Sequence, residues 1–207
     1  MPRALISANR EESSRIQDRV SRPKKKTTGR ITPPDGFRYA KDIISRDEEI
    51  ELVRLFETLP LKEFEFQGYL AKRRTTSFGW HYKFGDGSLE KTKPIPDFLF
   101  PLRERAAAFA GLETDDLVHA LVTEYRPGTP IGWHRDKSVF EDVVGISLSS
   151  RSLFRFRRIT ETGWERYTHI LDPRSIYLLR GDVRLNWEHS IPEVDELRYS
   201  ITFRSLK

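Results

Sequence analysis

The residues best suited to chemistry in this chain are two histidines and an aspartate. His134 and Asp136 stand two positions apart, so in an extended segment both side chains project to the same side. His189 lies far downstream and supplies a third donor from another segment. Two imidazoles and one carboxylate form a set that binds Fe(II) on one face and leaves the remaining coordination positions open. Because a His-x-Asp pair also arises by chance, a structural or surface role is the alternative.

A second group of charges lies in the last predicted strand, which runs from Arg198 to Arg204. Its apolar residues Tyr199, Ile201 and Phe203 alternate and therefore share one face. The opposite face carries a guanidinium at each end, and such a face needs water or anions. Arginine suits carboxylates because its planar fork donates two parallel hydrogen bonds. The pattern predicts a dianion site beside the metal site, and a solvated sheet face with surface ion pairs is the alternative.

Two helices are predicted ahead of most of the strands. Ser45 and Glu48 have the spacing of a capping box, and the apolar stripe after them predicts a helix that ends near Leu59. A second helix is predicted over 97–110, with Gly111 as its C-terminal stop. Strands are predicted over 63–69, 75–82, 117–125, 143–149, 153–158, 166–170, 175–180, 183–187 and 197–204. This order predicts an α+β fold, mainly β, in which N-terminal helices flank a jelly roll.

Composition divides the 207-residue chain into a basic tail and a folded part. Hydrophobic residues make up 37% of the chain and aromatic residues 12%, which is enough for a sizeable core. Residues 1–30 hold nine of the 36 Lys and Arg residues but three of the 31 Asp and Glu residues, so the remainder is near neutral. We expect residues 1–34 to be a disordered basic tail and residues 35–207 to be one domain. The tail either binds phosphates or only aids solubility.

Composition also excludes several classes of protein. No run of about eighteen apolar residues is present, so no membrane span is predicted. The N-terminus lacks the apolar region of a secretory signal. The absence of cysteine excludes disulfides and thiolate metal sites. We expect a cytoplasmic protein, or a nuclear one in a eukaryote, that is monomeric and does not bind membranes.

Three segments resemble the AlkB family of Fe(II)/2-oxoglutarate dioxygenases over about residues 60–207. The first runs from Thr123 to Asp136, where the family pattern is N-x-Y-x-x-G followed by H-x-D. The second joins the segments 145–148 and 154–156, and the third joins 189–191 to 198–204. The resemblance implies a double-stranded β-helix, which is a form of jelly roll. Residues 35–115 would supply the helices and a nucleotide-recognition lid, and residues 116–207 the catalytic core.

The resemblance also implies a role for individual residues. It implies O2 as the second substrate. The Fe(II) ligands would be His134, Asp136 and His189. The far carboxylate of 2-oxoglutarate would be held by Arg198 and Tyr125. The metal-proximal end and the pocket wall would be formed by Arg204, Thr123, Ser200 and Ile131. The family often has Asn at two of these positions, where this chain has hydroxyl side chains that still form hydrogen bonds. We therefore expect rearranged contacts and not a dead site.

The substrate side is predicted from a segment similar to the family's nucleotide-recognition lid. Its candidate contacts are Arg73, Arg74, Phe78, Trp80 and Tyr82. Aromatic rings stack on extruded bases and arginines bind phosphates, whereas ordinary strand packing explains the same alternation. Ser138 stands where DNA-repair members commonly carry an acid that reads the base. The preferred base is therefore not implied by the resemblance.

Two further segments bear on the substrate. The segment 181–189 resembles the G-x-x-R-x-x-W/F-x-H pattern of members that act on tRNA or on proteins, and here it contains Arg184 and Trp187. A basic cluster is formed by Arg151, Arg155, Arg157 and Arg158. Phosphate contact and a solvated outer face explain this cluster equally well.

Three functions follow, in order of preference. The first is oxidative demethylation of N-alkylated nucleic-acid bases, dependent on Fe(II), 2-oxoglutarate and O2, with release of succinate, CO2 and formaldehyde. The second keeps these cofactors but modifies a tRNA base further or oxidises a protein side chain. The third is non-catalytic nucleic-acid binding dominated by the basic tail. For the demethylase function the expected partner is methylated DNA or RNA. For the non-catalytic function it is nucleic acid in general.

Overall fold

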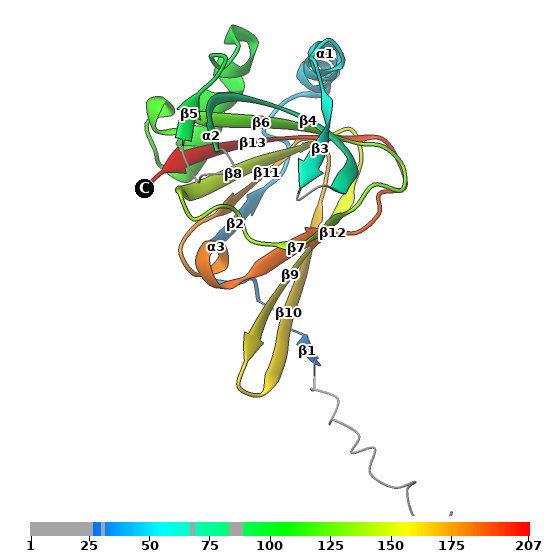
Figure 1. The fold of residues 1–207 in the computed structure, drawn as a ribbon, viewed down its shortest axis with the longest axis vertical. Helices are drawn as coiled ribbons and strands as arrows, with labels where there is room; N and C mark the ends of the chain where they lie inside the picture. The colour runs from blue at the N-terminus through cyan, green and yellow to red at the C-terminus, as the bar shows by residue number, and fades with distance from the viewer. Residues whose placement is uncertain (1–26, 30–31, 67–68, 83–88) are drawn as a thin grey trace, which may run out of the picture.

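Two β-sheets face each other in the computed structural model, which describes residues 27–29, 32–66, 69–82 and 89–207 (Figure 1). The major sheet has the strand order β2-β11-β8-β13-β6-β4-β3, with β5 paired to β4. The minor sheet has the order β1-β10-β9-β12-β7. Its β9 and β10 form a long hairpin that extends away from the rest of the fold (Figure 1). The predicted class, α+β and mainly β, is confirmed.

The chain contributes its strands to the two sheets in an interleaved order. The major-sheet strands are β2 (Phe37–Ala40), β3 (Lys62–Phe66), β4 (Tyr69–Tyr82), β5 (Leu89–Lys91), β6 (His119–Tyr125), β8 (Phe140–Leu148), β11 (Ser175–Leu179) and β13 (Arg198–Leu206). The minor-sheet strands are β1 (Thr27–Gly29), β7 (Ile131–His134), β9 (Ser152–Thr160), β10 (Gly163–Leu171) and β12 (Glu188–Ile191). The helices are α1 (Arg46–Glu57), α2 (Phe100–Ala110) and α3 (Asp182–Asn186), with short 3-10 turns at Asp97–Leu99 and Thr114–Asp116.

Both predicted N-terminal helices are present with the expected ends. The Ser45 hydroxyl accepts a hydrogen bond from the Glu48 N–H, and the Glu48 carboxylate accepts one from the Ser45 N–H. This reciprocal pair satisfies two of the backbone donors that a helix start leaves open. Gly111 ends α2 in the left-handed conformation, with φ of 68°.

The two faces of β13 separate the hydrophobic core from the interior between the sheets. Tyr199, Ile201 and Phe203 pack in a cluster with Phe56 of α1 and Leu102 of α2. This cluster fills the space between the helices and the outer face of the major sheet. A second cluster lies between the sheets and is rich in aromatic residues. The arginines of β13 lie on that inner side, and they are buried, which excludes the prediction of a solvated face.

Several predicted elements differ in the structure. Residues 183–186 belong to helix α3 and not to a strand, and Trp187 follows the helix in an extended conformation. The helix forms because Gly181 turns the chain with φ of 58° and its carbonyl accepts hydrogen bonds from the N–H groups of Arg184 and Leu185. The short strands β2, β7 and β12 have no counterpart in the predicted set. Strand β1 lies within the predicted disordered tail, and residues 1–26 lie outside the described part of the chain.

Candidate metal and co-substrate site

Strand pairing in the minor sheet brings the two predicted histidine ligands together. His134 of β7 and His189 of β12 occupy the same register position, and their ring centroids lie 4.3 Å apart. Asp136 follows β7 directly, and its Oδ2 lies 3.5 Å from Nε2 of His189. The three predicted ligands, which are far apart in the sequence, therefore lie at one place on the inner side of the sheet.

Hydrogen bonds to neighbouring groups orient two of these three side chains, Asp136 and His134. Arg204 of β13 donates from Nε and Nη2 to Oδ1 of Asp136, at 3.1 and 2.9 Å. Nδ1 of His134 lies 2.8 Å from the Gly132 carbonyl oxygen, a contact that places the ring proton on Nδ1. The atoms left for an ion are one carboxylate oxygen and the Nε2 atoms. Contacts of this kind fix the tautomer and orientation of metal ligands.

The charge states of His189 and Asp136 also suit a cation. Burial, reinforced by His134, lowers the pKa of His189 to about 3, so its imidazole is neutral near pH 7. Burial alone would raise the pKa of Asp136, but Arg204 and the two histidines outweigh it and hold that pKa below its usual range. Metal ligands must be deprotonated, and both groups already are at neutral pH.

The donor chemistry of the trio fits Fe(II), which prefers two imidazoles and one carboxylate. In the part of the chain that the structure describes, no three His, Cys, Asp or Glu side chains converge closely enough to hold an ion as they stand. The imidazoles of His134 and His189 instead pack against each other. Their backbones are already paired, so side-chain rotation is the adjustment that remains.

Arg198 is the residue whose surroundings suit binding of 2-oxoglutarate. Its side chain is 1% exposed, its Nε donates to the Ser147 hydroxyl at 3.1 Å, and its guanidinium lies 4.7 Å from the centre of the Tyr125 ring. Its Nη1 is buried and has no hydrogen-bond partner. A buried charged donor without an acceptor is costly, and a carboxylate supplies the acceptor and the opposite charge. Arg198 therefore fits the far carboxylate of a dicarboxylic acid.

The remaining predicted co-substrate residues lie in the strands around these groups. Ser200 is paired with Thr123 on β6, both are buried, and both face the interior between the sheets with Arg198. Ile131 starts β7 and packs against the core cluster between the sheets. The structure thus brings the predicted ligands, arginines and hydroxyls to one region, and their contacts with a co-substrate stay predictions.

Tyr177 of β11 is a residue at this site that the sequence did not indicate. Its ring lies across Gly145 of β8, where an added Cβ would be 2.1 Å from the Tyr177 Cζ. Burial, with Tyr125 and Asp136 and against the opposing effect of Arg198, raises the pKa of Tyr177. The phenol therefore stays protonated and presents a hydroxyl to the interior between the sheets. The signal in the sequence was Gly145, a glycine inside a strand that marks a close approach.

Arg184 of α3 holds the loop that carries the carboxylate ligand. It is 4% exposed, and its Nη2 donates to the carbonyls of Lys137 and Phe140, the latter at 2.9 Å. Burial lowers the pKa of Arg184, and Asp136 opposes this effect. Trp187 is fully buried and donates to Asp182 at 3.0 Å. Both residues of this sequence pattern therefore have structural roles around the site.

Two predicted arginine contacts with substrate differ in their surroundings. Arg73 is half-buried, and its guanidinium interacts electrostatically with Tyr125, which places it beside the candidate site. Arg74 points to the opposite face of β4, where it donates to Glu124 at 3.2 Å and to the Leu61 carbonyl at 3.0 Å. The pairing with a buried carboxylate gives Arg74 a structural role, and its contact with substrate stays a prediction.

The aromatic residues predicted for substrate contact also differ in their burial and surroundings. Phe78 is 5% exposed and belongs to the core cluster under the helices, so the prediction that it stacks on a base is wrong. Trp80 is half-buried, with the Lys91 ammonium 5.3 Å from its ring centre. The side chain of Tyr82 lies outside the described residues. Ser138 is exposed in the loop after Asp136.

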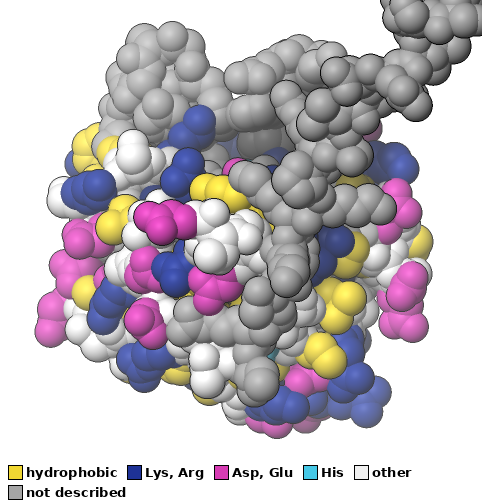
Figure 2. Space-filling view, turned by 90° about the horizontal axis from the view of Figure 1, so that it is seen from below, with side chains coloured by type: hydrophobic (Ala, Val, Ile, Leu, Met, Phe, Trp, Pro, Cys, Tyr) yellow, Lys and Arg dark blue, Asp and Glu magenta, His cyan; other side chains and the backbone are white. Residues whose placement is uncertain are grey.

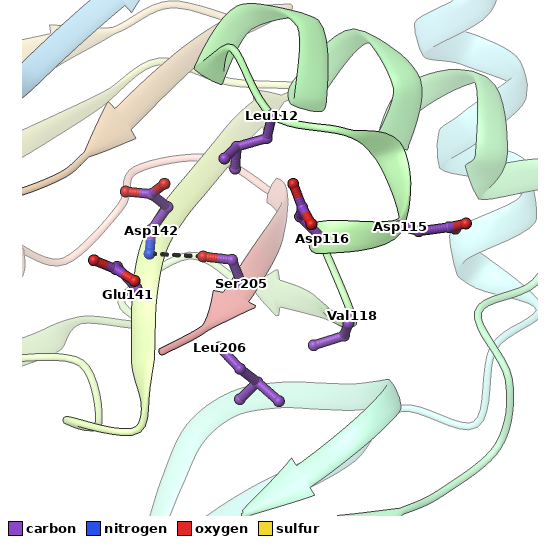
Figure 3. A pocket seen from close by; sticks show the side chains of 8 residues that line it. All are labelled: Leu112, Asp115, Asp116, Val118, Glu141, Asp142, Ser205 and Leu206. Carbon is purple, nitrogen blue, oxygen red and sulfur yellow. Dashed lines mark hydrogen bonds between the residues drawn. The ribbon is translucent and has the colours of Figure 1, made fainter.

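A separate acidic pocket lies away from this site. Its volume is about 300 Å³, and it is lined by Leu112, Asp115, Asp116, Val118, Glu141, Asp142, Ser205 and Leu206. Figure 3 shows its four carboxylates pointing in different directions. Asp142 is paired with Arg180 at 2.6 Å, and Asp115 with Arg103 at 3.3 Å. The pocket therefore does not gather free carboxylates around one point.

The class of protein follows from the fold and site together with a family match. The chain belongs to the 2OG-Fe(II) oxygenase superfamily, whose family model matches residues 36–204. It is an AlkB-like dioxygenase that depends on Fe(II) and 2-oxoglutarate and uses O2. The solved structure of OsALKBH1 has a TM-score of 0.64 at 15% identity and covers 84% of this chain and 98% of that one. This likeness confirms the jelly-roll fold.

Curated relatives carry several different names. The Alkylated DNA repair protein ALKBH8 homolog of Arabidopsis thaliana is 30% identical over 165 residues, 66% of this chain and 47% of that protein. The tRNA (carboxymethyluridine(34)-5-O)-methyltransferase ALKBH8 of Mus musculus is 27% identical and covers 83% of this chain and 26% of that protein. The Probable RNA/DNA demethylase ALKBH6 of Danio rerio is 27% identical and covers 79% and 72%. The chain thus spans half or less of the first two relatives.

Among the described residues, none of the helices has the length and apolar character needed to cross a membrane.

Proposed function

We propose that this chain oxidatively removes alkyl groups from the nitrogens of nucleic-acid bases. The observation that carries the chemistry is the meeting of His134, His189 and Asp136 with the buried, incompletely paired guanidinium of Arg198. The names of the relatives, which include DNA repair and RNA/DNA demethylation, support a nucleic-acid substrate.

The side chains of the site would hold the reactants. His134, His189 and Asp136 would bind iron, which supplies the activation of O2. Arg198 would bind the far carboxylate of 2-oxoglutarate, and the Tyr177 hydroxyl would donate to the same molecule. Arg204 would keep Asp136 ionised and oriented, because its Nε and Nη2 already donate to Oδ1. The burial of His189, Arg198 and Arg204 would limit the access of water to the reacting atoms.

The atoms of the proposed reaction balance as follows. One oxygen atom of O2 enters the N-methyl group, and the other enters the keto acid, which loses CO2 and becomes succinate. The N–CH2OH product breaks at its C–N bond, the nitrogen regains a proton, and formaldehyde leaves. One 2-oxoglutarate is therefore consumed for each formaldehyde released.

The test is turnover of a substrate panel by the full chain with Fe(II), 2-oxoglutarate and O2. The panel contains DNA and RNA oligonucleotides with bases methylated on ring nitrogens, and the same oligonucleotides unmodified. We expect succinate and formaldehyde in equal amounts from at least one methylated oligonucleotide, and neither from His134→Ala. Succinate production that no methylated oligonucleotide stimulates would contradict the proposal.

A second candidate is hydroxylation of a substituent on a tRNA base. The name of the mouse relative, a tRNA methyltransferase, supports tRNA as the substrate but not this reaction. The pattern that contains Arg184 and Trp187 also favours tRNA, and the oxidation is that of the 2OG-Fe(II) oxygenase superfamily. In this case tRNA would stimulate succinate formation and gain one oxygen atom in its mass, without release of formaldehyde. The two candidates are thus separated by the formaldehyde measurement.

A further inference from the structure

The outer face of the minor sheet carries indole and guanidinium groups in alternation. We call this set of residues the Trp–Arg face, and its members are Trp133, Arg155, Arg157, Trp164 and Arg166. The Arg157 guanidinium lies 4.4 Å from the Trp133 ring centre and 4.6 Å from that of Trp164. Arg155 lies 5.2 Å from Trp133, and Arg166 lies 5.9 Å from Trp164. The contacts form one continuous row across the sheet.

The alternation of the strands places this row opposite the candidate active site. Phe154 and Phe156 of β9 are each 1% exposed and face the interior, so Arg155 and Arg157 project outward. On β7 the interior position belongs to the predicted ligand His134, so its neighbour Trp133 projects outward. The Trp–Arg face therefore begins directly behind the metal site, at the edge strand of the sheet.

The charges of the face are only partly compensated. Arg157 is paired with Glu188 at 2.6 Å, whereas Arg155 donates to the uncharged Ser190 hydroxyl at 3.1 Å. Within the described residues, the guanidinium of Arg166 has a ring contact but neither a hydrogen bond nor an ion pair. It also lies opposite Arg157 in the register of β9 and β10, so two like charges are neighbours. An anion on this face would relieve that repulsion.

Apolar side chains surround these cations and are unusually exposed. Ile159, opposite Trp164, is 54% exposed, and Leu153 and Ile170, opposite each other, are 44% and 45% exposed. The surface seen from below shows Lys and Arg interspersed with Asp, Glu and hydrophobic side chains (Figure 2). The Trp–Arg face thus differs from a uniformly charged surface, because it combines cations with flat and apolar groups.

We propose that the Trp–Arg face binds a single-stranded segment of nucleic acid that flanks the reacting base. Guanidiniums bind phosphates and indoles stack on bases of any type, which is how sequence-tolerant single-strand sites work. Strands β7 to β10 span three inter-strand spacings, about 14 Å. A stacked strand rising about 3.4 Å per nucleotide covers this width with about four nucleotides. The inference rests on the proposed nucleic-acid substrate and adds the position of the flanking strand.

The test measures binding alone, so that its failure is distinct from a failure of the proposed reaction. Metal-free full-length protein is titrated into fluorescent, unmethylated 12-nucleotide DNA and RNA single strands at several salt concentrations. The variants are Arg155→Ala/Arg166→Ala and, as a matched control, Arg54→Ala on α1, whose ion pair with Glu51 is exposed. Thermal unfolding confirms that each variant is folded.

We expect the double variant to bind at least about tenfold more weakly, while the control variant binds as the parent does. The slope of log K against log salt should fall by about 1.4, because each lost phosphate contact on a single strand contributes about 0.7. Restoring the charge with Arg155→Lys/Arg166→Lys should recover the salt slope but not the full affinity, since lysine does not stack on indole.

Three results would overturn the proposal. The first is an unchanged affinity and salt slope in the folded double variant. The second is loss of affinity only when residues 1–26 are deleted, which would assign binding to the basic tail. The third is binding to vesicles rich in phosphatidylserine, with loss in the double variant, but no binding to either oligonucleotide, which would make the face a membrane contact.

Discussion

Replacing Arg198 with methionine tests the co-substrate site through two quantities, the stability of the ligand-free protein and its stabilisation by 2-oxoglutarate. The guanidinium is 1% exposed, makes one hydrogen bond to Ser147, and leaves Nη1 unsatisfied. Without co-substrate it is a buried charge with poor compensation, and apolar residues of similar volume replace such charges at little or no cost. We therefore expect Arg198→Met to leave the melting temperature of the ligand-free protein unchanged or raised, and to lose its response to 2-oxoglutarate.

The size of the lost response follows from the contacts. A hydrogen bond to a charged group is worth about 1.5–3 kcal/mol, so its removal raises the Kd for 2-oxoglutarate by about 10- to 150-fold. At a concentration 100 times the parent Kd, 2-oxoglutarate stabilises the parent by about 2.7 kcal/mol. With a 100-fold weaker Kd the same concentration gives about 0.4 kcal/mol. For a domain of this size the shift in melting temperature falls from about 5–10 °C to about 1 °C.

The assay is thermal unfolding with Mn(II) in place of Fe(II), with and without 2-oxoglutarate, so that no turnover occurs. Arg103→Met is the matched control, because Arg103 is also a largely buried arginine and donates to the Leu117 carbonyl at 2.9 Å. We expect Arg103→Met to lower the melting temperature of the ligand-free protein and to keep the full shift. A full shift in Arg198→Met would refute the assignment, and so would destabilisation of its ligand-free form equal to that of the control.

Three further substitutions probe the surroundings of the site. Gly145→Val should lower the free energy of unfolding in urea by about 1–3 kcal/mol, because its Cβ meets the Tyr177 ring; adding Tyr177→Ala should restore part of it, and no recovery would exclude that contact as the cause. Tyr199→Phe should cost about 1 kcal/mol at pH 7, since a buried Glu124 loses a donor at 3.0 Å. Burial and this hydrogen bond raise the pKa of Tyr199 to about 12, so the stabilisation is complete below pH 10 and is lost between pH 10 and 12; a difference between the two proteins that stays constant over this range would contradict the reasoning. Arg184→Lys should weaken Mn(II) binding about tenfold in calorimetry without unfolding the chain, because one ammonium cannot serve both loop carbonyls; unchanged Mn(II) affinity would exclude a role in positioning the ligand loop.

Features whose interacting residues lie close together in the sequence could be predicted from local sequence patterns. The capping box at Ser45 and the helix stop at Gly111 depend on contacts within a few residues, and both appear in the structure. The strand from Arg198 to Arg204 and its two faces were also predicted, because side chains alternate between the faces of a strand with a two-residue period. The sequence did not reveal that this charged face is buried, since the minor sheet that covers it comes from distant segments.

Features that depend on register and tertiary partners were not predictable. Strands β7 and β12 have four residues each, too few for a periodic signal. They exist because they pair with each other and because β12 also pairs with β9. The resemblance to the nucleotide-recognition lid placed Phe78 and Arg74 among the candidate substrate contacts, and alternation alone could not tell which face of β4 meets the helices. Phe78 instead packs in the core, and Arg74 binds Glu124, a partner that only the pairing of β4 with β6 brings near.

The most direct test of the central claim is the visible spectrum of the full chain with Fe(II) and 2-oxoglutarate under anaerobic conditions. Chelation of ferrous iron by the keto acid produces a weak charge-transfer band, which requires the metal ligands and the co-substrate site together. We expect this band with the parent protein, its absence in His134→Ala, and its appearance only at much higher 2-oxoglutarate concentrations in Arg198→Met. No band with the folded parent protein, or an equal band in His134→Ala, would contradict the account.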